Sequence, residues 1–246
     1  MKPVDCHCHL DFDRFDEDRH EVISRAKEKL DFIVCVGCDP ERNRNTLEIA
    51  EEYGDFVKFN LGLHPTSVDY FSQLEEVKKQ IRREDPVAIG EIGLDHHHIE
   101  KEEIREKQED VFRELLELAE ELGKPVNVHS RDAEQRTIDI LSEYDLPSVL
   151  IHCFNGTSRQ AEKAVEKGMT IGVTTQVLYS DNVQELVDCL NVEDIVLETD
   201  SPFLYRGDRN EPVNVCESAE KIAELKGISV DQVIESTSSN ARKIFS

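Results

Sequence analysis

The sequence has no tryptophan, only two methionines and 6% aromatic residues. No apolar run reaches the roughly 18 to 20 residues that span a bilayer. The first residues carry no basic flank followed by an apolar stretch, so they predict no secretion signal. Seven cysteines, an odd count, in a chain without such a signal indicate reduced thiols rather than disulfides. We therefore expect a cytoplasmic protein that does not associate with membranes.

Basic residues are also scarce. Lys and Arg number 29 against 53 Asp and Glu, which gives a formal net charge of −24. This balance excludes broad electrostatic binding to DNA or to anionic membranes, since such proteins usually carry a basic surface. It is compatible with a nucleic-acid substrate, because bound divalent cations supply positive charge beside a phosphate. The acidity itself is most simply explained by solubility or by a saline cytoplasm.

A second CxxC motif is missing. Cys35 and Cys38 form one such motif, but no partner motif follows to complete a zinc site. Cys35 lies inside the apolar run 32–36, and free cysteine is among the most buried residue types. The motif therefore predicts a buried strand cysteine rather than a redox or metal element.

Short apolar runs alternate along the chain with charged segments of helical periodicity, such as residues 102–122. This alternation predicts a parallel sheet with right-handed crossovers. Eight such units in 246 residues match the α/β architecture of a (β/α)8 TIM barrel. The candidate strands are 4–9, 32–36, 57–63, 87–92, 126–129, 149–153, 169–173 and 195–198.

The alternative is a doubly wound open sheet. That fold normally has a glycine-rich turn after its first strand, and residues 8–12 contain no glycine. The barrel is therefore preferred. No linker rich in Pro, Gly or Ser divides the chain, so residues 1–246 are predicted to form a single domain. Residues 229–246 are expected to form one or two short closing helices that carry Val233, Ile234, Ile244 and Phe245 toward the core.

Several ionisable residues fall at or near the carboxyl ends of the predicted strands. The ends of barrel strands converge on one face, where active sites are built. Imidazoles and carboxylates that meet there suit zinc, manganese, iron or magnesium. The pattern therefore predicts a metal-dependent hydrolase with the ligands His7, His9, Glu91, His129, His152 and Asp200, and with His64 nearby.

The first predicted strand carries two of these ligands. His7 and His9 are two positions apart, so both side chains lie on one face of a strand. Ionisable groups are rarely buried without a partner or a metal, which favours their role as ligands. Cys6 and Cys8 alternate with the histidines and are predicted to face the other way, as packing residues.

The acidic ligands have supporting neighbours. Gly90 and Gly93 flank Glu91 and let backbone approach closely, which leaves the carboxylate available to bridge two cations. Glu198 precedes Asp200 by two positions and should share its inward face. It is a candidate to orient a metal ligand by hydrogen bonding.

These residues lie in motifs that occur in one order along the chain. The motifs are Asp5-Cys6-His7-Cys8-His9-Leu10, Gly62-Leu63-His64-Pro65, Gly90-Glu91-Ile92-Gly93-Leu94-Asp95, His129-Ser130-Arg131, His152-Cys153-Phe154-Asn155-Gly156 and Glu198-Thr199-Asp200-Ser201-Pro202. Together they resemble the TatD family of metal-dependent deoxyribonucleases, within the amidohydrolase superfamily. The resemblance extends over essentially the whole chain.

The resemblance implies a site for two divalent metal ions per subunit, with magnesium, zinc or manganese as the candidates. One ion would be held by His7, His9, Glu91 and Asp200, and the other by Glu91, His129 and His152. Asp200 would also accept a proton from the attacking water. His64 and Arg131 would stabilise charge on the phosphoryl oxygens. For Arg131, a surface ion pair is an equally open interpretation.

The sequence departs from the family pattern after Asp95. His96, His97 and His98 follow, where an aromatic residue is more usual. Adjacent residues seldom share one face, so at most two of these histidines should point the same way. A solvated loop is the preferred interpretation, with an extra metal or a substrate contact as the alternative.

The preferred function is hydrolysis of DNA phosphodiesters at short or single-stranded ends. The same metals could instead serve an amide, ester or lactone hydrolase, since fold alone does not fix chemistry. A non-catalytic metal-binding partner protein is a third hypothesis. The sequence gives no sign of an obligate protein partner.

Overall fold

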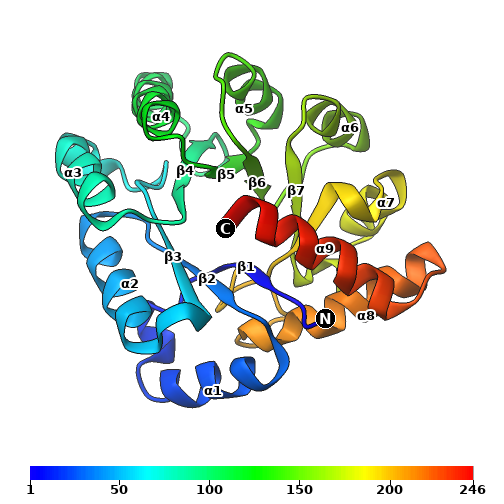
Figure 1. Cartoon of the computed structure of the whole chain (residues 1–246). Coiled ribbons are helices and arrows are strands. Elements are labelled where there is room, and N and C mark those ends of the chain that lie inside the picture. The colour runs from blue at the N-terminus through cyan, green and yellow to red at the C-terminus, as the bar shows by residue number, and fades with distance from the viewer. Residues whose placement is uncertain (246) are drawn as a thin grey trace.

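The computed structural model describes residues 1–245 and contains eight parallel strands in the order of the sequence (Figure 1). Each predicted strand is present, and the prediction of a (β/α)8 barrel is confirmed. The strands are β1 (Asp5–Cys8), β2 (Ile33–Val36), β3 (Val57–Leu61), β4 (Ala88–Asp95), β5 (Val126–Arg131), β6 (Val149–His152), β7 (Thr170–Val173) and β8 (Ile195–Leu197).

The barrel closes between its last and first strands just beyond the end of β8. The Asp200 amide donates to the His7 carbonyl at 2.9 Å, and the His9 amide donates to the Ser201 carbonyl at 2.8 Å. Cys8 and Ser201 form a parallel bridge at the same seam. Closure of the sheet therefore places Asp200 beside the two histidines of β1.

Helices surround the strands (Figure 1). They are α1 (Arg19–Lys29), α2 (Pro40–Tyr53), α3 (Leu74–Glu84), α4 (Glu102–Leu122), α5 (Glu134–Leu141), α6 (Ser158–Glu166), α7 (Asp181–Cys189), α8 (Val215–Lys226) and α9 (Val230–Phe245). The helix predicted at 102–122 is present with those bounds. Among residues 1–245, no helix combines the length and apolarity needed to cross a membrane.

The last helix closes the amino-terminal end of the barrel (Figure 1). It is one helix of 16 residues rather than two short ones, and Ser246 lies outside the described residues. Asn240 donates to the carbonyl of Ile195, the first residue of β8, at 3.0 Å. A buried apolar cluster joins the helix to the strands and their approaches: Ala241, Ile244 and Phe245 with Val4, Cys6, Phe32, Val34, Val36, Ala88, Leu150 and Val196. Val233 is buried elsewhere in the core, and Ile234 is partly buried.

The two cysteines of β1 do not share a face, which corrects the prediction that both point away from the histidines. Both are buried, but Cys8 packs in the large apolar cluster that includes residues of the outer helices. Cys6 packs in the separate cluster that α9 forms with the strands. The pairing of β1 with β2 is irregular between Asp5 and Cys8. Strict alternation therefore fails in this strand.

Candidate metal centre

The predicted site residues meet at the carboxyl end of the barrel. A cavity of about 810 Å³ lies there, and its lining includes His9, His64, Glu91, His129, Arg131, His152 and Asp200. His7 is fully buried beneath it. Glu91 lies within β4 rather than near its end, because this strand continues to Asp95, beyond the predicted limit at residue 92.

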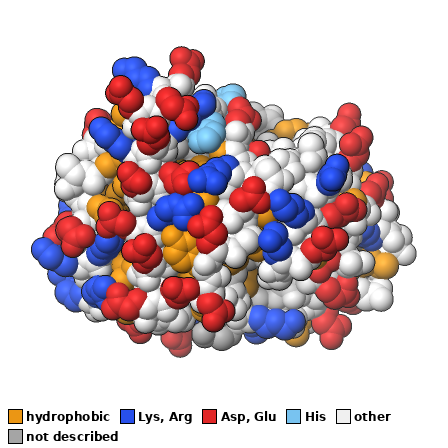
Figure 2. All heavy atoms as spheres, turned by 90° about the horizontal axis from the view of Figure 1, so that it is seen from above, with side chains coloured by type: hydrophobic (Ala, Val, Ile, Leu, Met, Phe, Trp, Pro, Cys, Tyr) orange, Lys and Arg blue, Asp and Glu red, His pale blue; other side chains and the backbone are white. Residues whose placement is uncertain are grey.

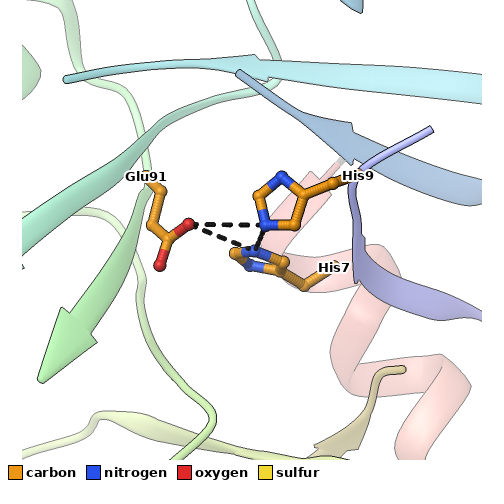
Figure 3. Close-up of side chains that lie close together, drawn as sticks. All are labelled: His7, His9 and Glu91. Atoms are coloured by element: carbon orange, nitrogen blue, oxygen red, sulfur yellow. Dashed lines mark hydrogen bonds and ion pairs between the residues drawn. The ribbon is translucent and has the colours of Figure 1, made fainter. Parts of the chain in front are cut away.

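The first ligand group combines the two histidines of β1 with both acidic residues. His7 Nε2 and His9 Nε2 lie 3.1 Å apart, and they lie 3.5 and 3.6 Å from Glu91 Oε2 (Figure 3). Asp200 Oδ1 is 3.4 Å from His9 Nε2 and 3.9 Å from His7 Nε2. His7, His9 and Glu91 therefore place three potential ligand atoms within 4.8 Å of one another, and Asp200 flanks the two histidines.

The contacts of the two Nδ1 atoms are compatible with a cation at this point. His7 Nδ1 lies 3.2 Å from Asn127 Oδ1, and His9 Nδ1 lies 2.9 Å from the Val36 carbonyl. Both partners are acceptors, so each Nδ1 can carry the proton, and each Nε2 is then able to offer a lone pair to a cation. In that tautomer both Nε2 atoms and the Glu91 carboxylate could hold a cation, with Asn127 and the Val36 carbonyl orienting the rings.

A second group lies on the other side of Glu91. His129 Nδ1 is 2.9 Å from Glu91 Oε1, while its Nε2 is 3.1 Å from Asp95 Oδ2. His152 Nε2 is 3.9 Å from Glu91 Oε1, and its Nδ1 is 3.0 Å from Glu198 Oε1. His129 therefore groups with Glu91 and His64, whereas the His152 ring stacks on His7 at 3.5 Å and its centroid lies 6.4 Å from that of His129.

The two oxygens of Glu91 are divided between these groups. Oε2 faces the histidines of β1, and Oε1 faces His129. Burial alone would raise the pKa of the Glu91 carboxyl, but His64 and His7 outweigh it and hold that pKa well below its usual range. The carboxylate is therefore ionised and available on both sides. For His129, burial lowers the pKa, but Asp95 and Glu91 raise it to about 9 in the absence of a cation.

His64 lies beside the second group but differs from its members in tautomer. Its Nε2 is 3.3 Å from Glu91 Oε1, and its Nδ1 accepts a hydrogen bond from the Thr66 amide at 3.1 Å. An amide can only donate, so His64 Nδ1 is unprotonated and Nε2 carries the proton. His64 therefore presents a hydrogen-bond donor to the cavity, not a lone pair.

Arg131 lies exposed at the rim of the cavity. Within residues 1–245, no side chain forms an ion pair or hydrogen bond with its guanidinium. A surface ion pair is therefore not what holds it. An unpaired guanidinium beside a cavity is available to an anionic ligand.

Two of the three consecutive histidines face the site. His97 and His98 line the cavity and are exposed, whereas His96 does not line it. His98 Nδ1 is 2.9 Å from Asp95 Oδ2, the same oxygen that contacts His129. The loop is thus solvated, as preferred, and also connected to the second ligand group.

Two further residues support the histidines and were not predicted. Asn127 faces His7, and Asp95 faces His129. Asn127 lies between two buried valines near the start of β5, two positions before His129, and that spacing was the available signal. Asp95 followed the predicted end of its strand, so its inward direction had no signal.

Comparison with known proteins places these observations in a family. The model of the family described as TatD related DNase matches residues 4–246. Human deoxyribonuclease TATDN3 is 37% identical, over 98% of this chain and 94% of the human protein. A metal-dependent hydrolase of Methanocaldococcus jannaschii is 36% identical, over 100% of this chain and 97% of its own length.

Solved structures agree. The TatD homologue YJJV from Escherichia coli superposes with a TM-score of 0.87 at 28% identity, covering 99% of this chain and 97% of that one. A TatD-family hydrolase from Entamoeba histolytica has a TM-score of 0.89 at 23% identity over 100% and 98% of the two chains, and it supports the fold alone. The family resemblance carried by the sequence motifs is confirmed: the chain belongs to the TatD family.

Proposed function

We propose that this protein is a hydrolase that uses two divalent cations to cleave phosphodiester bonds in DNA. The observation that carries the proposal is the division of Glu91 between two histidine groups, with Oε2 on one side and Oε1 on the other. His7, His9 and Asp200 would hold one cation with Glu91. His129 and His152 would hold the other, and the identity of the metal follows from supply in the cell.

Bound divalent cations activate water and neutralise charge on phosphoryl oxygens. The remaining steps fall to the chain itself. Asp200 accepts the proton of the attacking water, since its carboxylate lies at the cavity wall and stays ionised: burial raises its pKa, but His9 and His152 lower it further. His64 Nε2–H donates to a phosphoryl oxygen, and Arg131 pairs with a phosphate at the rim.

The surface favours a short substrate. Acidic and basic side chains are mixed over the side of the barrel in Figure 2, with no continuous basic band on that face. A net charge of −24 repels a long duplex backbone, whose binding depends on many Lys and Arg contacts. Short or single-stranded ends that reach the metals need few such contacts.

The proposal is tested with labelled single-stranded and duplex oligonucleotides, beside ester and lactone substrates. The protein is stripped with a chelator and reloaded with Mg²⁺, Mn²⁺ or Zn²⁺. We expect oligonucleotide cleavage that requires added metal and favours single-stranded ends. Cleavage confined to esters or lactones would overturn the assignment to DNA.

A further inference from the structure

The metal centre contains a ligand that the proposed hydrolytic site does not use. The sulfur of Cys153 lies with ligand atoms of His152 and Asp200 in one group, all within 4.8 Å of one another. Cys153 lines the cavity and is half-buried. Thiolate is a soft ligand that selects cations such as Cd²⁺ and Zn²⁺ over Mg²⁺ and Mn²⁺.

The backbone explains how two consecutive residues reach one site. Neighbours in a strand normally point to opposite faces. β6 ends at His152, and Cys153 then adopts a left-handed conformation with φ 45°. Asp200 is also left-handed, with φ 54°, just beyond β8. Such conformations are costly outside glycine and gather at functional sites.

An independent observation points to a cation at this group. His152 is only 3% exposed, and its Nε2 lies 3.9 Å from both Glu91 Oε1 and Asp200 Oδ1. These distances are too long for hydrogen bonds, so Nε2 has no hydrogen-bond partner among residues 1–245. Its Nδ1 lies 3.0 Å from Glu198 Oε1 on the opposite side of the ring, without the geometry of a hydrogen bond. Nε2 is therefore free to bind a metal from the side of Cys153.

The other cysteine near the centre does not offer the same arrangement. Cys38 Sγ is 3.7 Å from His9 Nδ1 and 3.9 Å from Glu91 Oε2. His9 Nδ1 is the nitrogen that donates to the Val36 carbonyl, so it cannot act as a ligand. A cation at Cys38 would therefore have only one further ligand, Glu91, whereas a cation at Cys153 would have two, His152 and Asp200.

We propose that His152, Cys153 and Asp200 form an alternative cation site for thiophilic divalent ions. An ion bound there takes His152 and Asp200 away from the two hydrolytic positions. Excess Zn²⁺ or Cd²⁺ thus inhibits hydrolysis supported by Mn²⁺ or Mg²⁺. The inhibitory consequence rests on the proposed function, while the binding site does not.

The binding site is tested with Cd²⁺ as the probe. Cadmium bound to thiolate gives a charge-transfer absorption in the ultraviolet that histidine and carboxylate ligands do not give. Metal-free full-length protein is titrated as wild type, Cys153→Ser, Cys38→Ser and Cys189→Ser, the last being an exposed cysteine remote from the site. We expect the absorption of the tight-binding phase to disappear in Cys153→Ser alone. Its persistence in Cys153→Ser, or its loss in Cys38→Ser, would overturn the site.

A second variant leaves the thiol in place. Asp200→Asn should weaken Cd²⁺ binding by about tenfold or more, since one charged ligand is lost, with the absorption still reached at saturation. Unchanged Cd²⁺ affinity would remove Asp200 from the site. Thermal unfolding of each variant checks that it is folded.

Inhibition is measured separately. Cd²⁺ is titrated into Mn²⁺-supported oligonucleotide cleavage, and Cys153→Ser should require about tenfold more Cd²⁺ for half-inhibition. An equal requirement in both proteins would overturn the inhibitory role. If no oligonucleotide is cleaved, the proposed function fails, whereas the absorption titration still decides the binding site.

Discussion

The two ends of the barrel are built on opposite principles. At the amino-terminal end, α9 covers an interior filled with aliphatic side chains, Cys6, Phe32 and Phe245, all buried. At the carboxyl end, buried histidines and carboxylates face one another with lone pairs directed to common points. The first end stabilises the fold without any ligand. The second holds polar groups that are arranged to bind cations. The residues that stabilise the fold and those that serve the site therefore lie at opposite ends of the barrel.

The sharpest test of this separation is Asp200→Asn. Loss of the proton acceptor should lower the rate of hydrolysis by about 10²–10⁴-fold. Folding should be retained, because the seam with β1 uses the Asp200 backbone amide rather than its side chain. The matched control is Asp188→Asn, which changes an exposed aspartate on α7. Normal turnover by Asp200→Asn would remove it as the base.

Phe245→Ala tests how much the apolar packing under α9 stabilises the fold. Removing this fully buried ring should lower the free energy of unfolding by about 3–5 kcal/mol. Phe203→Ala is the comparison at the other end, where Phe203 is 37% exposed and packs edge-on against Phe12, so its loss should cost less, about 1–2 kcal/mol. Urea unfolding measures both. Similar losses at the two positions would contradict the contrast between the ends.

His64→Ala removes both the N–H donor and the ring, and it tests whether His64 acts as a hydrogen-bond donor or as a metal ligand. If His64 Nε2–H donates to the substrate, hydrolysis should fall by about 10²–10³-fold while the metal content of the protein is unchanged. Elemental analysis beside the rate measurement decides between the two roles. Loss of one metal per chain would make His64 a ligand, contrary to the tautomer set by the Thr66 amide.

Asn127→Ala tests whether the hydrogen bond that orients His7 strengthens metal binding. Asn127 Oδ1 accepts a hydrogen bond from His7 Nδ1 and so orients the ring. Its removal should weaken metal binding by about 10–100-fold. Asn60→Ala is the matched control, since Asn60 is equally buried in β3 and its amide has no hydrogen-bond partner among the described residues. Metal titration of both variants gives the comparison. Equal affinities would show that Asn127 does not orient His7.

Much of this contrast could be predicted from sequence, because apolar runs that end in histidine or carboxylate have a clear pattern. All eight strands and the helix at 102–122 are present in the structure. The supporting residues were harder to predict. Whether Asp95 turns inward depends on how far β4 continues beside β5, where Asp95 pairs with Arg131. Cys6 was misplaced because the irregular pairing of β1 breaks the alternation on which the prediction relied.

The central claim is that Glu91 bridges two cations, one on the side of His7 and His9 and the other on the side of His129. The direct test is a crystal structure of the Mn²⁺-loaded protein with anomalous scattering. We predict two manganese peaks about 3.5–4 Å apart, bridged by Glu91, with one beside His7 and His9 and the other beside His129 and His152. A single peak, or two peaks that Glu91 does not bridge, would contradict the two-cation site.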